Sequence, residues 1–105
     1  MIGQDTTVRA QDTYDVDAIA GAALACPAVA RLDEGGTRAV ATYLPGRRVV
    51  GVRVEDRRVL VSLVLAYGSS VRSLEEQVRS AVEAHVGGRQ VDVHVADVQT
   101  VTELS

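Results

Sequence analysis

The chain has 105 residues, of which 11 are basic and 14 acidic, and its formal net charge is −3. This length accommodates one domain, and an apolar content of 47% is typical of a globular protein rather than a disordered one. The single cysteine excludes a disulfide framework and any site built from several cysteines. The acidic balance argues against a dedicated nucleic-acid binder, which usually presents a basic face.

The beginning of the chain, residues 1–12, is polar and lacks hydrophobic periodicity, so we expect a flexible N-terminal lead. It also lacks the apolar segment of a secretory signal. The longest apolar run, residues 59–67, is far shorter than the about 20 residues that a membrane-spanning helix needs. We therefore expect a cytoplasmic protein with one α+β domain over residues 13–98 and a polar C-terminal tail over residues 99–105.

The first helix is expected to begin near residues 13–15, where Thr13 or Asp15 can cap it, and to end before Pro27. No charged residue occurs from Ala18 to Ala30. A helix that is apolar on every side is normally buried on every side. Its apolar stripe has helical spacing and consists of Val16, Ile19, Ala20, Ala23 and Leu24.

The middle of the chain predicts a hairpin. Glycines interrupt residues 32–46, and within this segment residues 37–44 could form one or two helical turns. Residues 49–54 alternate as a strand, and the polar link 55–58 returns the chain into a second strand over 59–67. In that second strand, Leu60 and Val64 lie on the opposite face from Val59, Val61, Leu63 and Leu65.

The last third of the chain predicts a helix and a strand. The helix begins at Ser70 or Ser73 and ends at the Gly87–Gly88 pair, and a third strand follows over residues 91–98. The most economical arrangement is a two-layer α-β-β-α-β domain with both helices on one face of a three-stranded sheet. The second and third strands run the same way, but whether the third pairs with the first or the second stays open.

Two features favour an interaction surface. Helices can cover only one face of such a sheet, and the other face would carry aliphatic and charged side chains together. The apolar first helix would present a flank to water in a two-layer monomer. We expect the domain to self-associate or to dock through the open face of the sheet, with the candidates Leu60, Val64, Arg53 and His94, or through the first helix, with Ala22 and Ala25.

The residues that could carry chemistry do not converge in the sequence. Cys26 lies at the end of a helix, where nothing lowers its pKa, so we expect a small core residue. His85 lies in the last turn of the second helix, where a packing or capping role fits. His94 alternates with Asp92 on a strand, but no third ligand is near in sequence. We therefore predict no catalytic, cofactor or metal residues, no small-molecule substrate and no enzyme.

In order and spacing, the elements over residues 14–98 resemble those of the alkaline shock protein family. The departures are Arg72 and Ser73, where the family often has proline, Cys26 in place of an aliphatic residue, and the segment 33–46, which is hard to align. The matching segments are the small-residue helix 19–30, the paired strands 52–55 and 59–68, the helix 70–86 and the closing strand 91–98.

The resemblance implies a non-enzymatic bacterial protein of envelope stress or cell-envelope homeostasis. It implies self-association as a homo-oligomer and location near the cytoplasmic membrane through a small anchor protein. Two alternatives stay open, the first because a three-stranded sheet with helices on one side can bind RNA and the second because it has a similar order of elements. One is a KH-like RNA-binding module, although the G-x-x-G clamp and stacking aromatic residues are missing and no nucleic acid is expected. The other is an iron–sulfur assembly carrier, which the single Cys26 supports poorly.

Overall fold

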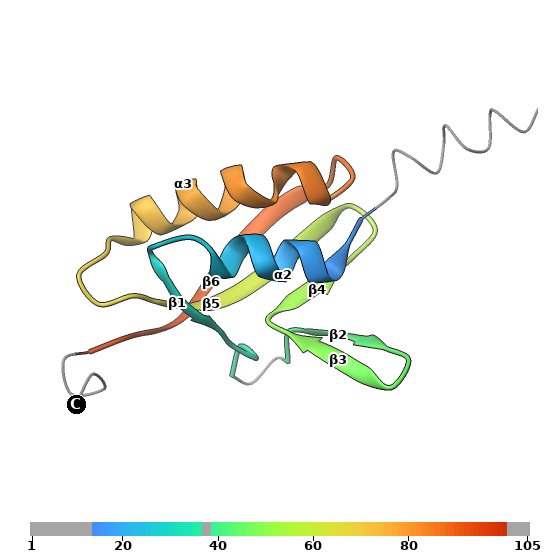
Figure 1. Cartoon of the computed structure of the whole chain (residues 1–105), viewed down its shortest axis with the longest axis horizontal. Helices are drawn as coiled ribbons and strands as arrows, with labels where there is room; N and C mark the ends of the chain where they lie inside the picture. Colours follow the sequence, from blue (N-terminus) through green and yellow to red (C-terminus); the bar gives the residue numbers. More distant parts are fainter. Residues whose placement is uncertain (1–13, 37–38, 101–105) are drawn as a thin grey trace, which may run out of the picture.

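The computed structural model describes residues 14–36 and 39–100. These residues form an α+β fold of two α helices, one short 3-10 helix and six strands (Figure 1). The predicted fold class is therefore confirmed. The predicted N-terminal lead 1–12 and most of the predicted tail lie outside the described residues.

The first helix, α2, spans Val16–Leu24 and follows from a local capping signal. Asp15 is the N-cap, and its carboxylate Oδ1 accepts a hydrogen bond of 3.1 Å from the Ala18 amide. The helix ends at Ala25, two residues before Pro27. A short strand that the sequence did not indicate, β1 (Val29–Leu32), follows directly.

The next segment is a hairpin, so the prediction of helical turns within 37–44 is wrong. Strand β2 (Ala41–Leu44) pairs antiparallel with β3 (Arg47–Val50), and the two form a separate two-stranded sheet. The prediction of one strand over 49–54 is also wrong, because Gly51 divides it. Gly51 has a φ of +87°, in the left-handed region, and the chain leaves the hairpin there to enter β4 (Val52–Val54).

The main sheet is built around β5 (Arg58–Leu65). The last strand, β6 (Gln90–Val98), pairs with β5 in parallel along its whole length, which settles the strand order that the sequence left open. Both β4 and β1 pair antiparallel with β5, beside residues 59–61 and 63–65 respectively. Since β6 occupies one edge of β5, β4 and β1 lie end to end along the other. The sheet is three strands wide but has four strands rather than the predicted three.

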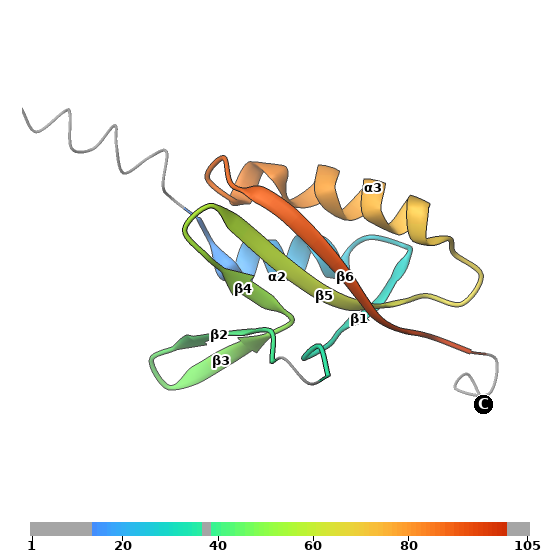
Figure 2. The same cartoon turned by 180° about the vertical axis from the view of Figure 1, so that it is seen from behind.

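The second helix, α3 (Val71–Val82), begins at the N-cap Ser70, whose hydroxyl accepts from the Ser73 amide at 3.1 Å. The 3-10 helix η1 (Glu83–His85) extends it. Figures 1 and 2 show α2 on one side of the sheet and β5 and β6 uncovered on the other. The buried residues of both helices share one core with the strands, including Ile19, Ala23, Leu74, Val78, Val82, Val52, Val59, Val61, Leu63 and Leu65.

Candidate interaction surface

We call the side of the main sheet that faces away from the helices the open face. Strand alternation and the pairing register place its side chains in rows across the sheet. One row joins Arg53, Leu60 and Asp92, the next joins Ser62 and His94, and the third joins Arg31, Val64 and Asp97. The register therefore brings together the four predicted sheet residues, Leu60, Val64, Arg53 and His94.

The centre of the open face is shielded from solvent. Ser62 and Val64 are both 0% exposed, so the expectation that Val64 is available to a partner is wrong. The segment 39–41 lies beside this face, because the Ala39 carbonyl accepts a hydrogen bond from Arg53 at 3.4 Å. Val64 belongs, with Val40 and Ala41, to the buried residues outside the helix-side core.

The accessible part of the open face is its perimeter. Leu60 is half-buried and His94 is exposed. Near the turn at 55–58 the charged side chains pair with one another. Arg58 contacts Glu55 at 2.9 Å and Asp92 at 3.2 Å, and these carboxylates raise the pKa of the guanidinium above its ordinary value. Exposed ion pairs of this kind contribute little stability, but they hold the Asp92 carboxylate in a defined position.

The two predicted helix residues do not join this surface. Ala22 is half-buried and packs against the helix-side core, and Ala25 is the exposed C-cap of α2. Because α2 covers the opposite side of the sheet, the four predicted sheet residues and the two predicted helix residues lie on two separate surfaces. On the helix flank Leu24 is 49% exposed beside the exposed Gly21, so α2 presents an apolar flank to solvent, as the sequence led us to expect for a two-layer arrangement.

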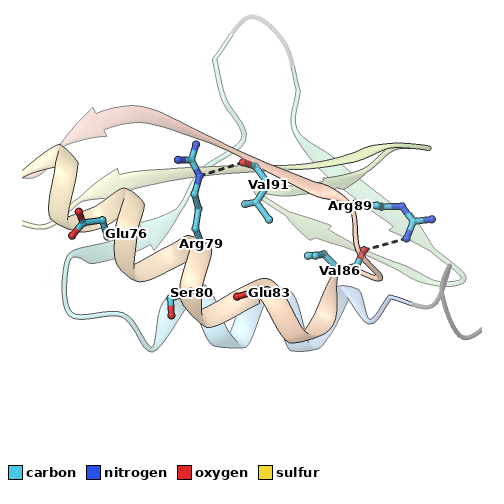
Figure 3. A pocket seen from close by; sticks show the side chains of 7 residues that line it. All are labelled: Glu76, Arg79, Ser80, Glu83, Val86, Arg89 and Val91. Carbon is cyan, nitrogen blue, oxygen red and sulfur yellow. Dashed lines mark hydrogen bonds between the residues drawn. The ribbon is translucent and has the colours of Figure 1, made fainter.

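An open groove of about 490 Å³ runs between α3 and β6 (Figure 3). Val86 and Val91 are its apolar members, and Glu76, Arg79 and Glu83 contribute charges from the helix side. Arg79 reaches across the groove, and its Nε donates to the Val91 carbonyl at 3.3 Å. At the end of the groove Arg89 is held by the carbonyls of Glu55 and Val86 and lies 5.0 Å from the Tyr14 ring centroid.

The outer edge of β6 borders this groove. Within the described residues β6 pairs only with β5. The Val91 carbonyl accepts from Arg79 on the side away from β5, so alternation turns the backbone groups of Val93 and Val95 to that side as well. This edge could not be predicted from the sequence, because the sequence left the pairing of the last strand open. An uncovered strand edge is a ready template for pairing with another chain.

The residues considered for chemistry do not assemble into a site. Cys26 is buried, its Sγ donates to the Ala22 carbonyl at 3.4 Å, and burial raises the pKa of its thiol; the expected core role is confirmed. His85 is half-buried in η1, on the helix layer, whereas His94 lies on the open face. Residues 14–36 and 39–100 contain no group of three or more His, Cys, Asp or Glu side chains placed to hold a metal ion.

None of the helices in the described part of the chain is both long and apolar enough to cross a bilayer. Comparison of the sequence and structure with models of known protein families, curated proteins and solved structures gives no match. The resemblance to the alkaline shock protein family therefore stays a prediction from the sequence.

Proposed function

We propose that the chain is a non-enzymatic scaffold domain of the envelope-stress type, which acts through self-association and protein partners. The observation that supports this proposal best is a sheet covered by helices on one face only, whose edge strand β6 pairs with no strand on its outer side within the described residues. Mixed surfaces, in which half-buried aliphatic side chains stand among charged ones, suit association between proteins. The perimeter of the open face, with Leu60, Arg53 and His94, is of this kind.

The proposed setting is the cytoplasmic side of the membrane, where a small membrane protein anchors the domain. This part of the proposal rests on the resemblance of residues 14–98 to the alkaline shock protein family. In such an arrangement the domain itself needs no membrane-spanning segment, because the anchor supplies it.

Self-association is tested by sedimentation velocity of the full chain over a wide range of concentrations. The sedimentation coefficient should rise with concentration. Leu60→Glu, which places a charge on the perimeter of the open face, should weaken a contact through that face. Arg72→Gln is the matched control, because the Arg72 side chain is 89% exposed at the start of α3. A strict monomer at the highest concentration, with no partner crosslinked in cells, would contradict the proposal.

The membrane setting is tested by fractionation and crosslinking in cells under envelope stress. We expect the chain in the membrane fraction, crosslinked to a small membrane protein, and its release from that fraction when the anchor is deleted. A chain that stays in the soluble fraction without partners under stress would overturn this part. A salt-dependent shift of RNA by low micromolar protein would instead favour the KH-like alternative.

A further inference from the structure

We propose that the free edge of β6 pairs with β6 of a second copy of this chain, antiparallel and about a two-fold axis through Val93. The pairing sets Asp92 of each copy opposite His94 of the other. It rests on the proposed function, because it names the surface and the partner through which the chain self-associates. The proposal follows from three observations: the direction of the backbone groups of β6, the charges along it, and the groove beside it.

The backbone of β6 is regular where the pairing is proposed. Its register with β5 runs without a shift from Gln90 to Val95, and the irregularity comes only after Leu63 of β5. The outward groups of Val91, Val93 and Val95 therefore form one straight edge. Antiparallel pairing about Val93 sets Val91 opposite Val95 of the second copy as a hydrogen-bonded pair, and Asp92 opposite His94 as a non-hydrogen-bonded pair, in which side chains are closest.

Charge favours this register over the two registers that are shifted by two residues. A shift by two residues is the smallest that keeps the outward groups facing each other. A shift in one direction places Asp92 opposite Asp92, and a shift in the other places His94 opposite His94. Like charges directly opposite each other destabilise a strand pair. Only the register centred on Val93 gives two Asp–His pairs, and both lie on the open face, because Asp92 and His94 align with Leu60 and Ser62.

On the helix side of the sheet, the groove between α3 and β6 fits a side chain from β6 of the second copy. Val91, Val93 and Val95 point towards the helices and are only half-buried, although they pack against the core. In the proposed register Val95 of the second copy stands beside Val91, at the mouth of the 490 Å³ groove whose apolar members are Val86 and Val91. Burial of Val95 of the second copy against Val86 and Val91 supplies apolar contact that the outer edge of β6 lacks in a single copy.

Pairing would replace the existing contact between Arg79 and β6 and would leave the contacts of Asp92 intact. Arg79 must release the Val91 carbonyl, because the amide of Val95 from the second copy takes its place; the contact is long, at 3.3 Å, and Arg79 is exposed. Asp92 keeps its own partners, Arg58 at 3.2 Å and Gln90 at 2.9 Å. These groups hold the carboxylate on the open face, where His94 of the second copy would meet it.

A charge swap tests the pairing by sedimentation of the full chain. His94→Asp places two carboxylates opposite each other in each pair and should raise the dimer dissociation constant by roughly tenfold. The double variant Asp92→His with His94→Asp restores two opposite-charge pairs and should recover much of that loss. Recovery is not expected if the residues act only on folding, and thermal unfolding of each variant checks the fold.

A backbone substitution gives an independent readout. Val93→Pro removes the central outward N–H without removing a hydrogen bond to β5, and it should abolish dimerisation. If the chain self-associates but His94→Asp and a folded Val93→Pro leave the dissociation constant unchanged, the edge proposal fails and the proposed function stands. If the wild-type chain neither self-associates nor captures a partner, the proposed function itself fails.

The register is tested by cysteine crosslinking in a Cys26→Ser background. A mixture of Asp92→Cys and His94→Cys chains should form a disulfide between the two variants under mild oxidation, because non-hydrogen-bonded pairs bring Cα atoms within disulfide range. Each variant alone should crosslink much less. Equal crosslinking in all three samples would show that the register is wrong.

Discussion

The two faces of β5 are both buried at their centres, but by different means. Towards the helices, Val59, Val61 and Leu63 are 0% exposed and pack against residues of α2 and α3. On the open face, Ser62 and Val64 are also 0% exposed, yet neither of the two described α helices covers this face of β5. Apolar content alone therefore does not reveal which face a partner can use. The perimeter of the open face and the outer edge of β6 are accessible to a partner, whereas the centre of the open face is not.

The largest expected effect compares neighbouring residues on the two faces. Leu63→Ala should lower the free energy of unfolding by about 3.5 kcal/mol, because it opens a cavity in the helix-side core. Val64→Ala should cost about 2 kcal/mol if the centre of the open face is packed to a similar density. Urea unfolding monitored by circular dichroism measures both. A cost near zero for Val64→Ala would show that its shielding comes from loosely packed side chains.

The second prediction concerns Gly51, where the open face, the hairpin and β4 meet. An added Cβ would lie 2.7 Å from the Leu32 Cβ and 2.9 Å from the Ser62 carbonyl oxygen, at a φ of +87°. Gly51→Ala should therefore lower the free energy of unfolding by about 3 kcal/mol. Gly46→Ala is the matched control, because its φ is +77° but no atom lies within 4 Å of the added Cβ; it should cost about 1 kcal/mol. Equal losses of unfolding free energy for Gly51→Ala and Gly46→Ala would contradict the close packing of Gly51 against Leu32 and Ser62.

Gly51 also shows where sequence reasoning succeeds and fails. The helix predicted from Ser70 or Ser73 to the Gly87–Gly88 pair and the strands predicted over 59–67 and 91–98 correspond to α3 with η1, to β5 and to β6, although β5 already ends at Leu65. These elements could be predicted because hydrophobic spacing and caps such as Ser70 are local signals. The division of 49–54 was missed, because alternation continues through the glycine and the break depends on the distant Leu32 and Ser62. Strand β1 was missed because its four residues are too short to show a period.

The candidate surface was also predicted only in part, because local sequence signals do not report contacts between distant segments. Alternation correctly places Arg53, Leu60, Val64 and His94 on one face, since side-chain direction is a local property of a strand. The burial of Val64 and the free edge of β6 depend on strand order and on chain segments distant in sequence. Ala22 and Ala25 were predicted as an alternative surface on the first helix, and of these two residues Ala25 is exposed whereas Ala22 packs against the core.

A third, smaller effect is expected at Ser62. Its Oγ is buried without a hydrogen-bond partner within the described part of the chain. Burying an unpaired hydroxyl costs free energy, so Ser62→Ala should raise the free energy of unfolding by about 1 kcal/mol. Ser80→Ala, on the exposed side of α3, is the control and should change little. A loss of stability on Ser62→Ala would mean that the hydroxyl is paired in solution, for example through a water molecule.

The smallest effect concerns the ion pair that ties the hairpin to the helix side of the sheet. Arg47 of β3 contacts Asp17 of α2 at 2.8 Å, and this hydrogen bond lowers the pKa of the Asp17 carboxyl below its ordinary value. A carboxyl whose pKa is lowered by folding adds stability above its unfolded pKa and loses it as the pH falls through the folded value. Asp17→Asn should therefore lower Tm slightly at pH 7 and not at pH 2.

The effect at Asp17 must be small because both partners are exposed, at 53% and 61% for the side chains of Arg47 and Asp17. A double-mutant cycle with Arg47→Gln separates the pair from the effect of Asp17 on the first turn of α2. A coupling at pH 7 that disappears at pH 2 assigns the effect to the pair. A coupling that persists at pH 2 would show that packing of the Arg47 side chain, rather than charge, holds the hairpin against α2.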